Sequence, residues 1–490
     1  MKLIKNIVAI SCCVFSFIGN AYSASVCTIE QKAEILAPVT HGNKDSLINC
    51  NLTLSPNDVI TQRVQFIGNA SSNVTLDCNG GRIDMTKARQ LGIFSQNDDA
   101  VWVRSQLRRG EWHRPEHVTI KNCKIVGGVR VWGISKNGEG KETNASSHKP
   151  GHVNRLRSTA PYHTRIINST ITSDKRTHLY IATGASNTLV DSVKFRGYSD
   201  SVSLYLGAET TRTTIKNSYF YAGGGREKVA IDASNFNVLE GNYFSGINNG
   251  GIYLYRNCGE GGTIRYTTPS HNTIRYNKFY YNKYKGSNKA ISMSSRDGNR
   301  SYCDDDGRYK IPNSSSTNNR DFAVSNVIFL NQFLNRNPER YMTEGASALG
   351  KNTMWGNLMV NKFTNISAST AITRSSHQCR ITGNNAGCGF YLGCPVGYEI
   401  VGARSNCNLE WPPNDAKTLK LPKLGKMWVS KSSDRTSHGV CLIGKFSNAV
   451  SMPIDGIYEG ANKLYASCKE YDRNGGDCGI NAEVVCAKIR

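Results

Sequence analysis

The stretch "NTIRYNKFYYN", residues 272–282, decides the fold because its pattern is written several times along the chain. It is too polar for a buried strand and too rich in β-forming residues for an ordinary loop. Related copies are "TTIKNSYFYAG" from Thr213, "NVLEGNYFSGI" from Asn237 and "NVIFLNQFLNR" from Asn326. Each has an aliphatic residue at the third position, and most have Asn at the sixth and Phe at the eighth. Such a recurring frame indicates a repeat architecture.

The repeats are regularly spaced in the middle of the chain. Aligned on their first residue, they begin at Val74, Val118, Thr164, Thr188, Thr213, Asn237, Asn272, Asn326 and Gly356. The central starts lie 24 or 25 residues apart. A strand-rich period of this length, with Asn at a bend, predicts an all-β chain built as a right-handed parallel β-helix of about 9–11 coils. The Asn residues should form a hydrogen-bonded ladder, while Ile274 and Phe279 fill the interior.

The segment "VTLDCNGGRI" from Val74, together with the repeat, resembles the opening coil of the pectin-lyase-like right-handed β-helix superfamily. The resemblance covers roughly residues 45–370. It implies the fold and leaves the reaction open, because that superfamily includes lyases, hydrolases, epimerases, phage tailspikes and adhesins.

Residues 1–23 read as a secretory signal peptide. Lys2 and Lys5 precede the apolar run "IVAISCCVFSFIG", and small residues precede Ala24, where we expect the mature chain to begin. A lipoprotein cleavage site before Cys12 is the less favoured alternative, because Ala9 stands where Leu is usual. No later apolar run is long enough to span a bilayer. We therefore expect a secreted, periplasmic or cell-surface protein.

Fourteen cysteines remain beyond the signal peptide, and this even number in an exported chain favours disulfides over a metal site. They are Cys27, Cys50, Cys78, Cys123, Cys258, Cys303, Cys379, Cys388, Cys394, Cys407, Cys441, Cys468, Cys478 and Cys486. Three plausible pairs are Cys27 with Cys50, Cys78 with Cys123, and Cys258 with Cys303. The last pair would hold two loops over one face of the β-helix.

The last eight cysteines fall within residues 376–490 and mark a domain boundary. We expect a cap at 24–70, the β-helix at 71–375 and a small disulfide-rich β domain at 376–490. That final domain could attach the protein to a cell surface or cover the open end of the β-helix.

The chain is strongly basic, with a net charge of +23, which falls to +21 without the signal peptide. Such a surface attracts polyanions. Because the sequence shows no nucleic-acid-binding motif, we expect an acidic polysaccharide rather than DNA or RNA as partner. The alternative is that the charge only keeps the surface soluble.

A second strand in each coil shows period-2 alternation, as in "HLYIATG" from His178 and "GIYLYRN" from Gly251. The interior positions are Leu179, Ile181, Val202, Leu204, Val229, Ile231, Ile252, Leu254, Ile291 and Met293. The outward positions and strand ends carry His178, Tyr180, Ser203, Tyr205, Lys228, Asp232, Tyr253, Tyr255, Arg256 and Arg296. Aromatic rings, basic groups and a few titratable groups are what a groove for acidic sugars requires. We expect His178, Tyr180, Tyr205, Tyr253, Tyr255, Arg296 and Glu260 to bind substrate. A plain solvated sheet face is the alternative.

The segments "KVAIDASNFNVLEGNYFSG" and "LYRNCGEGG" resemble the Lys-then-Arg order of β-helix lyases of the chondroitinase B and alginate lyase type. That resemblance implies that Lys228 is the base and Arg256 the acid of a β-elimination, with Asp232 in the catalytic group. The match is partial, because Asp232 and Asn257 replace the residues usual in that family. No cofactor is required, although calcium could be held by Glu227, Asp232 or Glu260.

Three other functions remain open. Hydrolysis needs two carboxylates, which Asp200, Glu209, Asp232 and Glu260 could supply. The motifs of polygalacturonases are absent from the sequence. A C5-epimerase would use nearly the same residues as a lyase, and a non-catalytic adhesin could bind glycan through the same tyrosines. A polysaccharide lyase is the leading hypothesis.

Overall fold

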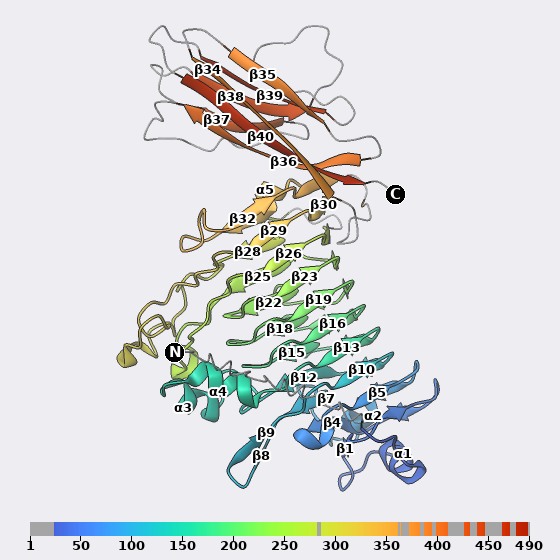
Figure 1. Ribbon diagram of the computed structural model, residues 1–490. Coiled ribbons are helices and arrows are strands. Elements are labelled where there is room, and N and C mark those ends of the chain that lie inside the picture. The colour runs from blue at the N-terminus through green and yellow to red at the C-terminus, as the bar shows by residue number, and fades with distance from the viewer. Residues whose placement is uncertain are drawn as a thin grey trace, which may run out of the picture.

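A computed structural model describes residues 24–281, 286–360 and 363, and the backbone of seven later strands. Three long parallel sheets run along a column, because each turn of the chain adds one short strand to each sheet (Figure 1). Successive strands of one sheet are therefore separated by a full coil. Helix α1 (Ile29–Leu36) lies at the end where the column begins (Figure 1).

The first sheet has ten strands, in an order that follows the chain. They are β1 (Asp45–Leu47), β4 (Arg63–Ile67), β7 (Asp99–Arg104), β12 (Gly128–Trp132), β15 (Leu179–Ile181), β18 (Leu204–Leu206), β22 (Val229–Asp232), β25 (Ile252–Tyr255), β28 (Ile291–Met293) and β31 (Met342–Glu344).

The second sheet also has ten strands. They are β2 (Leu52–Thr53), β5 (Thr75–Asp77), β10 (Thr119–Lys121), β13 (Arg165–Ile167), β16 (Leu189–Asp191), β19 (Thr214–Lys216), β23 (Val238–Glu240), β26 (Thr273–Arg275), β29 (Val327–Phe329) and β32 (Thr353–Trp355).

The third sheet repeats this arrangement and carries one extra strand, β21 (Gly223–Gly224), beside β17. Its other strands are β3 (Val59–Ile60), β6 (Arg82–Asp84), β11 (Lys124–Val126), β14 (Thr170–Ser173), β17 (Lys194–Ser199), β20 (Tyr219–Phe220), β24 (Tyr243–Ser245), β27 (Lys278–Tyr280), β30 (Gln332–Leu334) and β33 (Leu358–Val360). The three sheets confirm the predicted parallel β-helix, with ten coils. The coils start before the expected boundary at residue 70, since β1 to β4 already pair in them.

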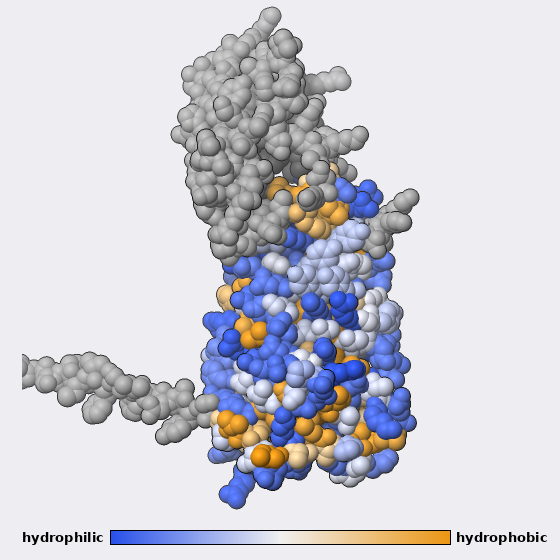
Figure 2. Space-filling model, turned by 90° about the vertical axis from the view of Figure 1, so that its right-hand side faces the viewer, coloured by the Kyte–Doolittle hydropathy of each residue, from blue (hydrophilic) through white to orange (hydrophobic). Residues whose placement is uncertain are grey.

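Other elements decorate the column. They are the helices α2 (Thr86–Gln90), α3 (Lys141–Ser147), α4 (His152–Thr159) and α5 (Pro338–Tyr341), the short 3-10 turn η2 (Glu260–Gly262), and the hairpin β8 (Gln106–Arg108) with β9 (Glu111–His113). Helices α3 and α4 lie beside the column near β12 and β15 (Figure 1). The outer surface on one side is mostly hydrophilic, with separate hydrophobic areas (Figure 2). No helix among the described residues is long and apolar enough to cross a membrane.

The repeated Phe and Asn positions build the interior as expected. The rings of Phe195, Phe220, Phe244, Phe279 and Phe333 stack from coil to coil, with centroids 4.6–5.0 Å apart. Each ring is fully buried. This continuous stack fills the column because the eighth position of every repeat points inward.

Buried Asn side chains form two ladders at the bends. The Nδ2 of Asn242 donates to Oδ1 of Asn277 at 3.0 Å, and Asn277 donates to Asn331 at 2.9 Å. A parallel ladder joins Asn237 to Asn272 at 2.8 Å. Because each amide also accepts from a backbone N–H of the coil before it, the ladders satisfy polar groups that the bends bury.

The three predicted disulfides of the β-helix are present: Cys27–Cys50, Cys78–Cys123 and Cys258–Cys303. The other eight cysteines lie outside the residues whose side chains are described. In that part of the chain the backbone forms antiparallel strands, which differ from the parallel coils. One sheet contains β34 (Ile372–Thr382), β40 (Asp477–Lys488) and β36 (Tyr398–Leu409), and the other contains β35 (Gly387–Gly393), β39 (Lys463–Glu470), β38 (Gly439–Lys445) and β37 (Lys426–Lys431).

Candidate functional site

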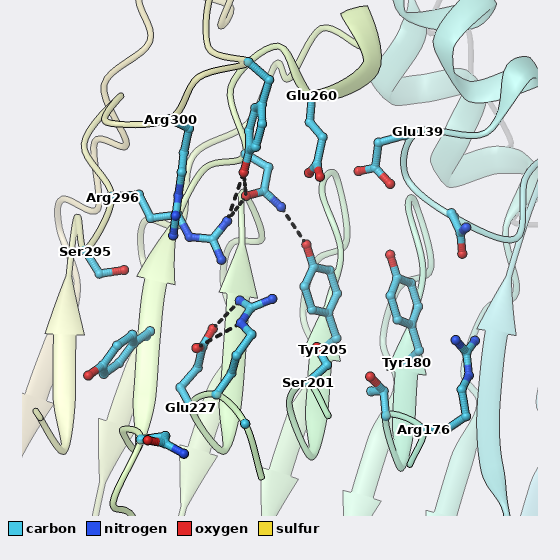
Figure 3. A pocket seen from close by; sticks show the side chains of 18 of the residues that line it. Glu139, Arg176, Tyr180, Ser201, Tyr205, Glu227, Glu260, Ser295, Arg296 and Arg300 are labelled. Atoms are coloured by element: carbon cyan, nitrogen blue, oxygen red, sulfur yellow. Dashed lines mark hydrogen bonds and ion pairs between the residues drawn. The ribbon is translucent and has the colours of Figure 1, made fainter. Parts of the chain in front are cut away.

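A groove of about 850 Å³ lies on the outward side of the first sheet, across strands β12 to β28. Five arginines, three glutamates and four tyrosines line it (Figure 3). They are Arg130, Arg176, Arg226, Arg296, Arg300, Glu139, Glu227, Glu260, Tyr180, Tyr205, Tyr253 and Tyr302. The size suits a few sugar rings, and the lining is polar and charged rather than aliphatic.

The floor of the groove is a column of residues in register on neighbouring strands. Arg130, Tyr180, Tyr205, Ala230 and Tyr253 pair successively from β12 to β25. The rings of Tyr180 and Tyr205 stack at 4.7 Å, and the guanidinium of Arg130 lies 4.2 Å from the centre of the Tyr180 ring. Period-2 alternation explains this column, because the flanking aliphatic residues of each strand fill the core.

Loops from distant parts of the sequence form the upper rim. The Nδ2 of Asn144, in α3, donates to the carbonyl of Gly261 at 2.8 Å, which joins the early insertion to η2. The disulfide Cys258–Cys303 joins η2's loop to the loop that carries Tyr302. A Cβ at Gly259 would lie 2.5 Å from the carbonyl oxygen of Tyr302, so only glycine allows this close approach.

Tyr205, Asp232 and Asn257 form a network at the centre of the groove. The hydroxyl of Tyr205 donates to Oδ2 of Asp232 at 2.5 Å, and Asp232 is buried behind it. The side-chain amide of Asn257 donates to both, at 3.0 Å to Tyr205 and 2.9 Å to Asp232. Burial first, and the Asp232 charge second, raise the pKa of Tyr205 well above its usual value. Tyr205 is therefore a neutral phenol whose proton already points at a carboxylate.

Arginines surround this network. Arg296 lies 3.5 Å from the centre of the Tyr255 ring and donates to Oδ1 of Asn257. Arg226 donates to Glu227 and to the hydroxyl of Tyr255, both at 2.7 Å. Arg300 is exposed at the rim. Because only part of this positive charge is paired within the groove, the groove is suited to an anionic ligand.

The three glutamates have different surroundings. Burial, and then the nearby Glu139, raise the pKa of Glu260 above its usual value. Glu139 forms an ion pair with the buried Arg265, and Glu227 forms one with Arg226. Glu260 and Glu139 lie on the same rim, whereas Glu227 lies across the groove from them (Figure 3). The site thus contains a carboxyl group with a raised pKa opposite a carboxylate with a cationic partner.

Several predicted binding residues line the groove, namely Tyr180, Tyr205, Tyr253, Arg296 and Glu260. The outward placement of His178 and Lys228 is wrong. His178 is fully buried, with Nε2 2.6 Å from the carbonyl oxygen of Arg196, and Lys228 is 3% exposed and donates to the carbonyl of Ala222. Both residues precede a strand, and the bend before the strand turns their side chains inward. Alternation does not hold there.

The expected exposure of three further residues is also wrong. Arg256 is 1% exposed, and it donates to the carbonyls of Asn318 and Arg320 rather than lining the groove. Tyr255 is fully buried beneath Arg296, and Asp232 is buried behind Tyr205. These groups support the groove from below.

Other predicted positions fall outside the groove. The interior aliphatic residues are buried in the core as expected, except that Val202 packs in a separate cluster with Tyr205, Ala230 and Tyr255. Ser203 is buried rather than outward, and it does not line the groove. Glu209 is fully buried, and Oε1 accepts from the backbone of Tyr266 at 2.8 Å. Asp200 is exposed but does not line the groove.

The groove does not fit the calcium site considered above. Glu227 is engaged by Arg226, and both oxygens of Asp232 accept hydrogen bonds from Tyr205 or Asn257. Glu260 lies on the opposite rim from Glu227 (Figure 3). In the described part of the chain no three His, Cys, Asp or Glu side chains gather as metal ligands would. We therefore assign no step to a metal.

Several groove residues were not predicted. Glu139 and Arg130 lie outside the strands that were compared, and Arg176 lies two residues before one of them, in a bend where alternation gives no orientation. Asn257 had a usable signal, because it directly follows Arg256 at the end of a strand that was recognised. Arg226 and Arg300 lie in loops that precede or follow strands, where alternation gives no orientation.

Comparisons with known proteins agree with the fold. The family model described as "Right handed beta helix region" matches residues 156–301, which confirms the predicted handedness for that segment. No curated protein matches the chain.

Solved structures similar to this chain include three with different functions. One is an alginate lyase from Paenibacillus sp. str. FPU-7, with 10% identity, a TM-score of 0.36 and coverage of 66% of this chain and 95% of that chain. Another is PfbA, a surface adhesin of Streptococcus pneumoniae, with 13% identity, a TM-score of 0.37 and coverage of 65% and 72%. A third is the A-module of the Azotobacter vinelandii mannuronan C-5 epimerase AlgE6, with 12% identity, a TM-score of 0.30 and coverage of 63% and 75%. At these values the matches carry no information about the reaction.

Proposed function

We propose that the protein binds an acidic polysaccharide in the groove on the first sheet and degrades it by β-elimination. The observation that carries this proposal is the arrangement of arginines around a tyrosine that is hydrogen-bonded to a buried carboxylate. Tyr180, Tyr205 and Tyr253 line the groove that would hold the sugars, and Arg296 and Arg300 offer charge to the sugar carboxylates.

The elimination requires a base for the C5 proton, a neutralised carboxylate and an acid for the leaving oxygen. Arg296 binds the uronate carboxylate and so makes C5 more acidic. The oxygen of Tyr205 takes the C5 proton while its own proton passes to Asp232, over the 2.5 Å hydrogen bond. The C4–C5 double bond forms as the C4–O bond breaks. Glu260, whose pKa is raised above its usual value, gives its proton to the leaving oxygen.

Hydrolysis is a second candidate because one observation favours it. Glu260 has a raised pKa, and Glu227 faces it across the groove as the partner of Arg226. In this reaction Glu260 protonates the glycosidic oxygen and Glu227 activates water or attacks the sugar. Glu260 is the acid in both reactions, whereas Tyr205 and Asp232 act only in the elimination.

The test mixes the purified protein with alginate, polygalacturonate, hyaluronan and chondroitin sulfate and follows absorbance at about 235 nm, where unsaturated uronates absorb. Elimination predicts a rise in absorbance that is lost in Tyr205→Phe and in Glu260→Gln. New reducing ends without absorbance, lost in Glu260→Gln and Glu227→Gln, would establish hydrolysis instead. Binding without either product would place the protein among glycan-binding proteins.

We also propose that residues 1–23 direct export and that residues 376–490 attach the protein to a cell surface. Three disulfides in the β-helix support an oxidising compartment. Amino-terminal sequencing of the protein recovered outside the cytoplasm should begin near Ala24. Recovery of the full-length amino terminus from the cytoplasm would contradict export.

A further inference from the structure

The third sheet carries a group of exposed tyrosines on its outer face, away from the groove. Tyr198, Tyr219 and Tyr221 are 45%, 38% and 41% exposed. Tyr198 is on β17, Tyr219 is on β20, and Tyr221 directly follows β20. The core and ladders of the β-helix do not use these side chains. We call Tyr198, Tyr219, Tyr221 and the neighbouring Tyr243 the tyrosine surface.

The rings of Tyr219, Tyr221 and Tyr243 form a connected platform. The ring centroids of Tyr219 and Tyr221 are 5.7 Å apart, and Tyr243 lies 6.2 Å from Tyr219 and 5.8 Å from Tyr221. Tyr219 and Tyr243 are in register on adjacent coils. Phe363 packs edge-on against Tyr243 and so covers that end of the platform. Parallel strands therefore hold several aromatic rings at fixed spacing on one face.

The charges in register with the platform rings, or stacked on them, are positive. Lys194 is in register with Tyr219, Lys278 is in register with Tyr243, and the guanidinium of Arg196 lies 5.3 Å from the centre of the Tyr221 ring. Two carboxylates lie further out: the exposed Asp200 follows Tyr198 by two residues, and Asp84 lies beyond β11 and β14 and is bonded to Arg82. Aromatic rings flanked by cations suit a ligand with both sugar faces and negative charge.

The platform adjoins the groove through two short chain segments. Three residues after Tyr198 the chain reaches Ser201, and four residues after Tyr221 it reaches Gly225, and both of these residues line the groove. The strand β21 lies between Tyr221 and Gly225 and pairs with β17. A polymer that leaves the lower rim of the groove can therefore continue around the corner of the column onto the tyrosine surface.

We propose that the tyrosine surface is a second binding site for acidic polysaccharide, which holds the part of a long chain that extends beyond the groove. The inference rests on the proposed function, because it takes the same polymer as ligand. A second copy of the protein is the less suitable occupant. A self-complementary contact here would bring Lys194 and Arg196 against their own copies, with like charges facing each other.

The test compares long and short substrates in the full-length protein. The variant is Tyr219→Ala/Tyr221→Ala, and the matched control is Phe236→Ala, a 48% exposed aromatic residue at a different bend. Linking two sites on one polymer raises apparent affinity, so the double variant should bind high-molecular-weight alginate or polygalacturonate at least about tenfold more weakly. Its turnover of short oligosaccharides, and the behaviour of Phe236→Ala, should match the wild type.

Further measurements separate the outcomes. A charge variant, Lys194→Gln/Arg196→Gln, should also weaken binding to the long polymer. Long-polymer binding that is equal in all variants would overturn the second site while leaving the groove reaction intact. A wild type that binds the polymer without cleaving it, and loses binding in the tyrosine variant, would uphold the second site and refute the proposed reaction. A change of oligomeric state in the tyrosine variant, by analytical ultracentrifugation, would assign the surface to self-association and overturn the proposal.

Discussion

Lys228 provides a quantitative test of the interior, because its side chain is buried with a lowered pKa. Burial alone lowers this pKa from 10.5 to about 8. A shift of one pKa unit corresponds to 1.36 kcal/mol, so the buried charge of Lys228 lowers the free energy of unfolding by roughly 3 kcal/mol at neutral pH. The side chain is 3% exposed, so water screens little of this cost.

The dependence on pH follows from proton binding. Between about pH 8 and pH 10.5 the unfolded chain keeps a proton on Lys228 that the folded protein has released, so the free energy of unfolding rises with pH. Lys228→Met lacks this proton. We expect the difference in unfolding free energy between the wild type and Lys228→Met to change by roughly 3 kcal/mol in favour of the wild type from pH 7 to pH 10.5. The lost hydrogen bond to Ala222 adds an offset that does not vary with pH.

The measurement is urea unfolding followed by circular dichroism at both pH values, with Lys194→Met as the exposed control. Lys194→Met should show the same difference from the wild type at both pH values. We also expect Lys228→Met to retain polysaccharide turnover within about twofold, because Lys228 does not line the groove. A folded Lys228→Met protein with a loss of more than about 100-fold would make Lys228 the base, and a difference independent of pH would refute its burial.

Three other predictions concern the groove and its support. The small residual activity of Glu260→Gln should lack the fall that the wild type shows as pH rises through the raised pKa of Glu260. Profiles of kcat against pH check this, and an unchanged alkaline fall in the variant would exclude Glu260 as the acid. Cys258→Ala/Cys303→Ala removes a cross-link between residues 45 apart and should lower the free energy of unfolding in urea by about 4 kcal/mol. Cys78→Ala/Cys123→Ala removes a cross-link of the same span and should lose less turnover. Phe244→Ala should destabilise the protein by about 3–5 kcal/mol without changing KM, and a smaller effect would mean that the Phe stack does not carry the core.

The fold was predictable from the sequence because each coil needs the same residue types at the same positions: an apolar residue in the interior and Asn at the bend. Phe279 lies in the interior stack and Asn277 in the Asn ladder, as the repeat predicted, and the three disulfides expected from the places of their cysteines in the coils are present. Tyr180 and Tyr205 were found for the same reason, since alternation holds within a strand.

The rest of the site depends on bends and on contacts between distant loops. Alternation fails at His178 and Lys228, because the chain turns immediately before each strand. Glu139 and Glu260 share one rim although they are far apart in sequence, and an insertion with α3 places the first of them. No periodic pattern in the sequence relates these loops, so only the folded structure shows that they lie next to each other.

The most direct test of the central claim is the absorbance at about 235 nm of the wild type and Tyr205→Phe with the four acidic polysaccharides. The proposed elimination predicts that the wild type produces this absorbance with at least one of them and that Tyr205→Phe, folded and still able to bind, loses at least about 100-fold in kcat. A Tyr205→Phe protein as active as the wild type would contradict the role of Tyr205 and Asp232 as the base.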